Sequence, residues 1–260
     1  MTQDLKKIAK SIIGRPPLRV YHAVRSGLTA LAYGLPARQM IAIGVTGTNG
    51  KTTTAHLITS IFEAAGRRVA MLSTIRYRVA GQESVNETKM TVPDAGAFNR
   101  FLSNAKKQRC GVLVMEATSH ALDQFRTFGI KFDTGVLTNI THDHLDYHGT
   151  LDAYVQAKRK LFASGLRVSV INADDPNGVI FAECPADVRV LYSLDASCAE
   201  ALRPLNLSLE NGISFNCAGP SLPEPFFIES KLTGTFNVSN LLAAIGVALG
   251  HGISIANIQK

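Results

Sequence analysis

The sequence has few of the features that mark disulfide-bonded or disordered proteins. Its four cysteines, Cys110, Cys184, Cys198 and Cys217, form no C-x-x-C pair and are widely spaced. This spacing favours free thiols in a reducing cytosol over a disulfide framework or a zinc knuckle. Charged residues make up only 18% of the chain and apolar residues 46%. A chain of 260 residues with this composition can bury a full core as one large domain, with or without an appendage.

The sequence also shows no pattern of a signal peptide or a membrane-spanning helix. Two adjacent prolines interrupt the N-terminal segment, and no uninterrupted apolar region follows the first lysines. The stretch 18–35 is apolar in character, but two arginines and a histidine within it argue against a helix that crosses a bilayer. We therefore expect a cytoplasmic protein.

Positive charge is concentrated at the N-terminus. Residues 1–40 carry seven lysines and arginines against one aspartate, a net charge of +6, whereas the other 220 residues carry 20 basic and 19 acidic groups. An almost neutral body argues against a nucleic-acid-binding surface, so we expect no nucleic-acid partner. The basic leader, residues 1–39, is expected to be helical. It would either dock on the main domain or make weak contact with a membrane surface as an amphipathic helix.

Short apolar runs alternate with helical segments along most of the chain. The expected strands cover residues 40–45, 68–74, 111–116, 134–139, 167–172 and 188–193. The expected helices cover residues 52–66, 94–107, 151–162 and 237–252, and a polar loop is expected between 74 and 94. Near-continuous apolar strands that alternate with helices indicate an α/β fold, a three-layer sandwich of a mostly parallel sheet between helices.

The pattern of apolar residues changes in the C-terminal third. Residues 205–217 place the dipeptide Asn211-Gly212 between two alternating runs, which is a strong signal for a β-hairpin. Residues 225–234 could add a third strand. We therefore expect a small antiparallel subsheet beside the main one.

The stretch GVTGTNGKTTT (44–54) follows an expected strand and opens an expected helix, which is the context of a phosphate-binding loop. In such a loop, backbone N–H groups and the helix N-terminus attract phosphate oxygens, Lys51 offsets their charge, and Thr52 can ligate Mg²⁺. The strict pattern G-x-x-x-x-G-K-T requires a glycine where this chain has Val45, although glycines flank that position. The prediction of a P-loop-like site therefore rests on the position of this stretch between an expected strand and an expected helix.

The stretch TNITHDHLDYHGT (138–150) contains three histidines and two aspartates, as a metal site would. His142, His144 and Asp146 match the first three positions of the zinc-hydrolase pattern H-x-H-x-D-H, but the last histidine comes one residue late. A zinc hydrolase has no need of an upstream phosphate loop. A magnesium-dependent nucleotide enzyme is therefore the favoured interpretation of the cluster.

The phosphate loop and four other stretches together resemble the Mur ligases, the ATP-dependent enzymes that build the peptidoglycan stem peptide. These stretches are MEATSHALDQFR (115–126), TNITHDHLDYHGTLDAYVQAK (138–158), INADDP (171–176) and LTGTFNVSNLLAA (232–244). The resemblance runs from about residue 41 to residue 252 and is strongest to the members that add the third residue of the stem peptide. It implies that residues 40–252 form the central ATP-binding domain of such a ligase.

The resemblance also implies what lies outside this central domain. Typical members have an N-terminal uridine-nucleotide domain and a C-terminal domain that binds the incoming amino acid. Here the basic leader stands in the place of the first, and residues 253–260 would be the start of the second. We expect the 260 residues alone to bind nucleotide but to form no amide, with the C-terminal domain or a chain that carries it as partner.

Metal and catalytic roles follow from the resemblance. It implies two Mg²⁺ ions, held by Thr52, Glu116, His144 and Lys158. In this family the lysine at the last position is carbamylated by CO₂, which turns a cation into an anion. Lys51 would act with these groups in catalysis. His120 and the other two histidines of the cluster are expected to be loop or packing residues.

The resemblance implies two further sets of contacts. The nucleotide would bind to Gly47, Thr48, Asn49, Gly50, Lys51, Thr52 and Thr53, with Asn240 facing adenine. The UDP-muramyl-dipeptide would bind to Thr91, Val92, Thr118, Gln124 and Arg126. Among these, the guanidinium group of Arg126 is the best candidate to bind an acidic substrate group. The common N-T-T motif reads Met90-Thr91-Val92 here, so this sequence departs from the family pattern at the substrate-binding positions.

The implied reaction is ATP-dependent amide synthesis in peptidoglycan precursor formation. The substrate carboxylate would be activated as an acyl phosphate and attacked by the amino group of a diamino acid. Two alternatives stay open: a related amide ligase such as a folylpolyglutamate synthase-like enzyme, and a non-catalytic nucleotide-binding module.

Overall fold

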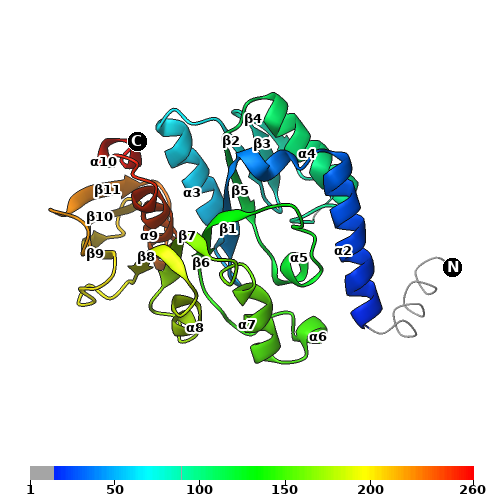
Figure 1. Ribbon diagram of the computed structural model, residues 1–260. Coiled ribbons are helices and arrows are strands. Elements are labelled where there is room, and N and C mark those ends of the chain that lie inside the picture. Colours follow the sequence, from blue (N-terminus) through cyan, green and yellow to red (C-terminus); the bar gives the residue numbers. More distant parts are fainter. Residues whose placement is uncertain (1–14, 89) are drawn as a thin grey trace.

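The computed structural model describes residues 15–88 and 90–260, so the first 14 residues of the predicted leader lie outside the described part. Its centre is an eight-stranded sheet with the order β4-β3-β2-β5-β1-β6-β7-β8 (Figure 1). The strands are β1 (Ile41–Thr46), β2 (Val69–Leu72), β3 (Arg76–Val79), β4 (Gln82–Val85), β5 (Val112–Glu116), β6 (Phe132–Leu137), β7 (Leu166–Asn172) and β8 (Ala186–Tyr192). The six strands from β2 to β8 in this order run parallel to one another.

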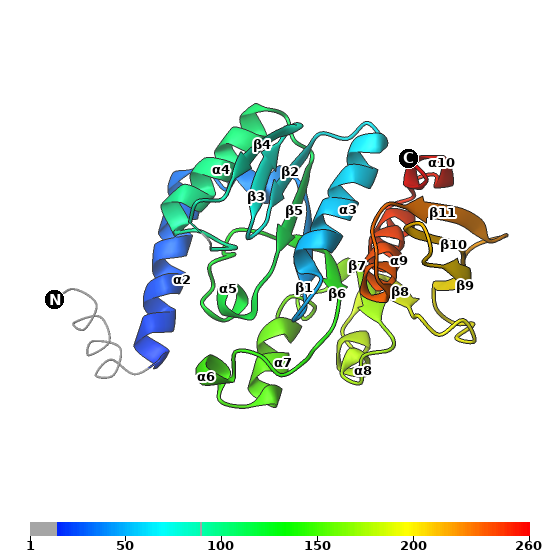
Figure 2. The ribbon, with the colours of Figure 1, turned by 180° about the vertical axis from the view of Figure 1, so that it is seen from behind.

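Helices cover both faces of this sheet, as Figures 1 and 2 show. Strands buried on both faces need apolar residues at successive positions, which explains the continuous apolar runs. In β1, Ile43 and Val45 pack with α3 and α9, whereas Ala42 packs on the opposite side with α4 and α7. The helices are α2 (Arg15–Ala32), η1 (Pro36–Gln39), α3 (Lys51–Ala64), α4 (Ala95–Lys107), α5 (Ser119–Asp123), α6 (Leu145–His148), α7 (Leu151–Arg159), α8 (Gly178–Ala182), α9 (Thr235–Gly250) and α10 (Ile255–Ile258).

A small antiparallel sheet lies beside the main one, with the order β11-β10-β9. Its strands are β9 (Arg203–Ser208), β10 (Ile213–Ala218) and β11 (Phe226–Ser230). Gly212 in the β9–β10 turn has φ +100°, a conformation that favours glycine. The predicted fold class, a mostly parallel α/β sandwich with a small antiparallel subsheet, is confirmed.

The prediction of a polar loop between 74 and 94 is wrong in part, because β3 and β4 form an antiparallel hairpin at the edge of the sheet. Ala80 and Gly81 both have positive φ angles, as a two-residue hairpin turn requires. All four residues of β4 are exposed and polar side chains dominate both strands, so no apolar run marks them. An edge strand with solvent on both faces lacks the signal that reveals a buried one.

The carboxyl ends of the parallel strands meet at one edge of the sheet. The phosphate loop follows β1, Thr74 follows β2, Glu116 ends β5 and Thr138 follows β6. Ligand sites of α/β sheets lie at this edge, because the connecting loops there can approach one another. Among the described residues, no helix is long and apolar enough to cross a bilayer.

His251, directly after α9, is a buried polar residue at the opposite edge of the sheet. Its side chain is 5% exposed. Arg167 Nη2 donates to its Nδ1 at 2.7 Å, so Nε2 carries the proton and donates to Thr134 Oγ1 at 2.8 Å. Burial and the charge of Arg167 lower the pKa of His251 from 6.5 to about 4. The imidazole is therefore neutral in the folded protein at neutral pH.

This neutral histidine predicts a pH-dependent stability. Because the pKa of His251 is lower in the folded chain than in the unfolded chain, its contribution is complete above pH 6.5 and disappears as the pH falls through about 4. The His251→Gln variant should be less stable at pH 7, and its deficit should shrink by up to about 3 kcal/mol towards pH 4. Urea unfolding over this range measures the difference, with the exposed His142→Gln as control. A constant deficit for His251→Gln would contradict the assignment.

Candidate functional site

The loop between β1 and α3 is held in shape by its glycines and by β6. Gly47 has φ +149° and Gly50 φ +82°. A Cβ atom at Gly47 would lie 1.8 Å from Thr138 Oγ1, so no larger residue fits there without a shift. The Thr48 N–H donates to the carbonyl of Asn139 at 2.8 Å, and the Asn49 N–H donates to the side chain of Asn139 at 2.9 Å. The loop is thus anchored to the chain that follows β6.

The open side of this loop is electropositive. The N–H groups of Lys51, Thr52 and Thr53, in the first turn of α3, have no acceptor among the described residues, as expected at a helix N-terminus. Lys51 Nζ donates to the carbonyls of Gly47 at 2.9 Å and Thr48 at 2.5 Å, and burial lowers the pKa of this lysine. Backbone donors and a lysine arranged in this way attract phosphate oxygens.

A cavity of about 310 Å³ opens in front of the loop. It is lined by residues 48–53 together with Thr74, Ile75 and Glu116. All predicted nucleotide contacts except Gly47 and Asn240 therefore line one cavity. Thr74 and Ile75 were not predicted from the sequence. The sequence did contain a signal for Thr74, because this residue ends an apolar run. The ends of neighbouring parallel strands meet at one edge of the sheet, so Thr74 could have been placed beside the loop.

Glu116 is a buried carboxylate beside the loop. Its residue is 1% exposed, and Thr52 Oγ1 donates to Oε1 at 2.7 Å. Thr74 donates twice, from its N–H to Oε1 at 3.0 Å and from Oγ1 to Oε2 at 2.9 Å. No lysine, arginine or histidine forms an ion pair with Glu116 in the described chain. A buried carboxylate that contacts a hydroxyl group and forms no ion pair has the donor set that suits a hard cation such as Mg²⁺.

Lys158 approaches the same loop from α7. It is 1% exposed, and its Nζ donates to the carbonyl of Gly47 at 2.7 Å and lies 4.4 Å from the ring centre of Tyr154. Burial, and after it the charge of Lys51, holds the pKa of Lys158 well below its usual value. No carboxylate forms an ion pair with this amine in the described residues. A buried lysine without an acidic partner is costly, which points to a role beyond packing.

The histidines of residues 138–150 do not form a metal site in the described part of the chain. His144 has φ +53°, its side chain is 49% exposed, and its ring lies 4.9 Å from the ring of His120. His148 is buried, and its Nε2 lies 2.9 Å from Ser119 Oγ. Burial and the charge of His120 lower the pKa of His148 to about 4. His142 is exposed. Among the described residues, no three histidine, cysteine or acidic side chains lie close enough together to hold a metal ion.

The predicted metal ligands are therefore brought together only in part. Thr52 and Glu116 are in contact, and Lys158 contacts the other side of the loop. Within the described part of the chain, no hydrogen bond or ion pair joins His144 to Glu116 or Lys158. His144 lies instead on the loop that precedes α6.

The residues predicted to bind substrate form a chain of contacts beside this site. Thr91 Oγ1 lies 2.8 Å from Thr74 Oγ1. Arg126 donates to Gln124 Oε1 at 2.9 Å and to the carbonyl of Val92 at 3.4 Å. Arg126 has no carboxylate partner among the described residues, so its guanidinium group can take an acidic ligand. Thr118 lies at the start of α5, where its hydroxyl accepts from the N–H of Ala121 at 3.2 Å.

Asn240 lies inside the protein, where α9 meets the phosphate loop. It is 4% exposed; its Oδ1 accepts from Thr54 Oγ1 at 3.2 Å and its Nδ2 donates to Asn237 Oδ1 at 3.0 Å. A Cβ atom at Gly50 would lie 2.3 Å from Asn240 Oδ1. In this position Asn240 fixes the loop relative to α9. Contact between Asn240 and adenine stays a prediction.

Comparison with known proteins places this geometry in a family. The family model described as the Mur ligase middle domain matches residues 45–248. The chain is 38% identical over 237 residues to the UDP-N-acetylmuramoyl-L-alanyl-D-glutamate–2,6-diaminopimelate ligase of Chromobacterium violaceum, covering 89% of this chain and 47% of that protein. It is 41% identical over 236 residues to the ligase of the same name from Synechococcus elongatus, covering 89% and 46%. The chain thus spans about half the length of the curated relatives it matches.

Solved structures agree with the sequence comparison. A structure of a UDP-N-acetylmuramoyl-L-alanyl-D-glutamate–2,6-diaminopimelate ligase superposes with a TM-score of 0.78 at 31% identity, covering 92% of this chain and 48% of that chain. The folylpolyglutamate synthase of Mycobacterium tuberculosis superposes with a TM-score of 0.72 at 17% identity, covering 91% and 61%, which shows a shared fold. From the phosphate loop to the last turn of α9, the chain belongs to the Mur ligase middle-domain family.

Proposed function

We propose that this chain is the ATP-binding part of an amide ligase that acts in peptidoglycan precursor synthesis. The observation that carries the proposal is the buried Glu116 carboxylate, which lies between Thr52 of the phosphate loop and Thr74 and forms no ion pair among the described residues. The names of the relatives support the substrate class, since both are ligases that act on UDP-N-acetylmuramoyl-L-alanyl-D-glutamate. Because ATP is the energy source, we place the reaction in the cytoplasm.

ATP would bind with its phosphates at the N-terminus of α3, where the free N–H groups and Lys51 face the cavity. Thr52 and Glu116 would hold one Mg²⁺ ion, because magnesium prefers hydroxyl and carboxylate oxygens. Glu116, His144 and a carbamate on Lys158 would hold a second. When bound, Mg²⁺ offsets negative charge on the phosphate oxygens.

Carbamylation of Lys158 would remove the electrostatic cost of burying this amine. An unmodified ammonium group there would place a second positive charge close to Lys51, in a region with little access to water. Addition of CO₂ converts Nζ to a carbamate, which carries a negative charge and two oxygen atoms. Those oxygens could accept hydrogen bonds or ligate Mg²⁺ where the amine could only donate.

The second substrate would bind along the chain of contacts that includes Thr91, Gln124 and Arg126. Arg126, whose guanidinium group donates to the carbonyl of Val92, would orient an acidic group of the muramyl-dipeptide, and Thr118 would also contact this substrate. The substrate carboxylate attacks the γ-phosphorus of ATP, ADP leaves, and an acyl phosphate forms. The amino group of the incoming amino acid then attacks the acyl carbon, and phosphate leaves. Lys51 would stabilise the charge on the phosphoryl group during transfer.

Since the chain spans about half the length of its relatives, we propose a division of labour along the sequence. Residues 40–252 would form the ATP-binding domain, residues 1–39 a leader, and residues 253–260 the link to a domain that binds the amino acid. Closure of such a domain would bring the amine to the acyl phosphate. Asn240 would then face the adenine ring from α9.

The role of Lys51 can be tested by nucleotide binding. Lys51→Ala removes the charge that faces the phosphate cavity, and we expect its affinity for ATP with Mg²⁺ to fall about 10- to 100-fold. Isothermal titration calorimetry measures the affinity. Lys106→Ala, which changes an exposed lysine of α4, is the matched control and should bind as the wild type does. Equal affinity for ATP in the Lys51→Ala and wild-type proteins would show that the proposed role of Lys51 is wrong.

The carbamate can be detected directly. In protein equilibrated with ¹³C-labelled bicarbonate, ATP and Mg²⁺, we expect a carbamate carbon resonance that disappears in Lys158→Ala. Lys160→Ala, at the end of the same helix, is the control and should retain it, because Lys160 is 42% exposed and pairs with Asp123. No resonance in the wild-type protein, or one that survives in Lys158→Ala, would count against the modification.

A further inference from the structure

Helix α2 presents its large apolar side chains away from the protein. Small residues face the body: Ser26, Gly27 and Ala30 are buried. At Gly27 the ring of Phe128 approaches so closely that a Cβ atom would lie 3.3 Å from it. The outward residues share an exposed fraction above half and form what we call the α2 stripe: Val20 at 62%, Tyr21 at 55%, Val24 at 54%, Leu28 at 64% and Leu31 at 60%.

The spacing shows that the stripe is one continuous surface. Residues 20, 24, 28 and 31 recur every three or four positions and therefore lie on one side of the helix. In a helix that only docks on a domain, the large apolar residues face the domain and small or polar residues face water. Here the order is reversed, and contiguous exposed apolar surface of this kind marks an interaction site.

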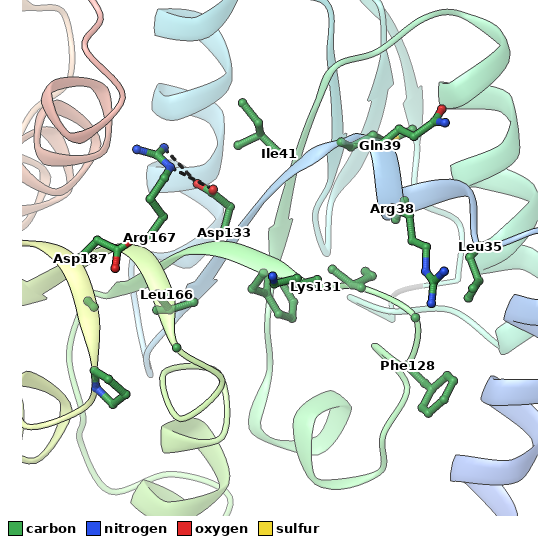
Figure 3. Close-up of a pocket in the computed structure, with 18 of the residues that line it drawn as sticks. Leu35, Arg38, Gln39, Ile41, Phe128, Lys131, Asp133, Leu166, Arg167 and Asp187 are labelled. Carbon is green, nitrogen blue, oxygen red and sulfur yellow. Dashed lines mark hydrogen bonds and ion pairs between the residues drawn. The ribbon is translucent and has the colours of Figure 1, made fainter.

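The stripe continues into a large hollow at the other edge of the sheet from the phosphate loop. This hollow of about 1140 Å³ is lined by Leu31 of the stripe and by Leu35, Arg38, Phe128 and Lys131. Figure 3 shows Leu35, Arg38 and Phe128 on the side towards α2. Phe128 is 48% exposed and so extends the apolar surface of the stripe.

The charges around this surface are mostly positive. Helix α2 contains no acidic residue, and Arg25, Arg38 and Lys131 are exposed. None of these three forms an ion pair among the described residues. Asp133 and Asp187, the acidic residues of the hollow, lie on the side away from α2, where Asp133 pairs with Arg167 (Figure 3).

This charge distribution discriminates between possible occupants. A second copy of the chain would bring two positively charged helices together, which like-charge repulsion disfavours. Residues 1–14 carry three lysines and one aspartate, so they too have the same sign of charge. A bilayer with anionic headgroups has an apolar interior and a negatively charged surface. It therefore matches both the apolar stripe and the positive charges around it. We propose that the α2 stripe binds the surface of a bilayer that contains anionic phospholipids.

In this arrangement α2 lies along the membrane and does not cross it. The apolar side chains of the stripe enter the boundary between headgroups and acyl chains, while Arg25, Arg38 and Lys131 remain at the level of the lipid phosphates. The affinity then depends on two separable contributions. One scales with the apolar area that enters the bilayer, and the other with the negative charge of the lipid and the salt concentration.

Vesicle co-sedimentation of the 260-residue chain separates these contributions. We expect binding to vesicles made of equal parts phosphatidylglycerol and phosphatidylcholine, and much weaker binding to phosphatidylcholine alone. Val24→Ser combined with Leu28→Ser should lower the partition coefficient by at least about tenfold. Arg25→Gln combined with Lys131→Gln should lower it by about tenfold on the anionic vesicles only.

A control variant changes exposed apolar residues elsewhere. Val179 of α8 is 62% exposed and Phe227 of β11 is 50% exposed. Both α8 and β11 lie away from α2 (Figure 1). Val179→Ser combined with Phe227→Ser should bind vesicles as the wild type does. Because all the substituted positions are exposed, the variants should unfold at the wild-type temperature, which a thermal melt checks.

Two outcomes would overturn the proposal. The first is a wild-type protein that binds neither kind of vesicle, or binds both equally well. The second is a concentration-dependent dimer, seen by sedimentation velocity, that is lost in the Val24→Ser, Leu28→Ser variant, because the stripe would then belong to a second copy.

Discussion

The burial of one carboxylate, Glu116, is the constraint on which the rest of the site depends. A buried charge is unstable unless hydrogen bonds or an opposite charge compensate it. Thr52 and Thr74 supply three hydrogen bonds, but no basic side chain among the described residues forms an ion pair with Glu116. To place these groups together, the fold must bring the ends of β2 and β5 and the start of α3 to one point. That is why the parallel order of these strands matters for function.

A second set of contacts holds the phosphate loop in place relative to the sheet. Gly47 is enclosed by Thr138, and its carbonyl accepts from both Lys51 and Lys158. On the other side, Asn240 of α9 closes against Gly50. Four elements that are far apart in sequence therefore determine one loop. A change in any of them would alter where the backbone donors of α3 point.

The sequence predicts the buried parts of this structure and misses the exposed ones. The five inner parallel strands β1, β2, β5, β6 and β7 are predicted correctly because burial on both faces demands continuous apolar residues. The β3–β4 hairpin was missed because its strands are polar and lie at the sheet edge. The role of Thr74 in holding Glu116 depends on strand order, which local patterns do not contain. The outward orientation of the α2 stripe also depends on the tertiary structure, because periodicity reveals that a helix has an apolar face but not whether that face packs on the protein or meets solvent.

We propose that this chain supplies the ATP-dependent step of amide synthesis, and a chimeric ligase tests this proposal. Residues 40–252 would replace the matching segment of a relative such as the Chromobacterium violaceum ligase. Mass spectrometry would then detect the amide formed from ATP, UDP-N-acetylmuramoyl-L-alanyl-D-glutamate and diaminopimelate. We expect ATP-dependent product that is lost when Lys51→Ala is introduced. A folded chimera that binds ATP and yet forms no amide would show that this chain does not supply the step.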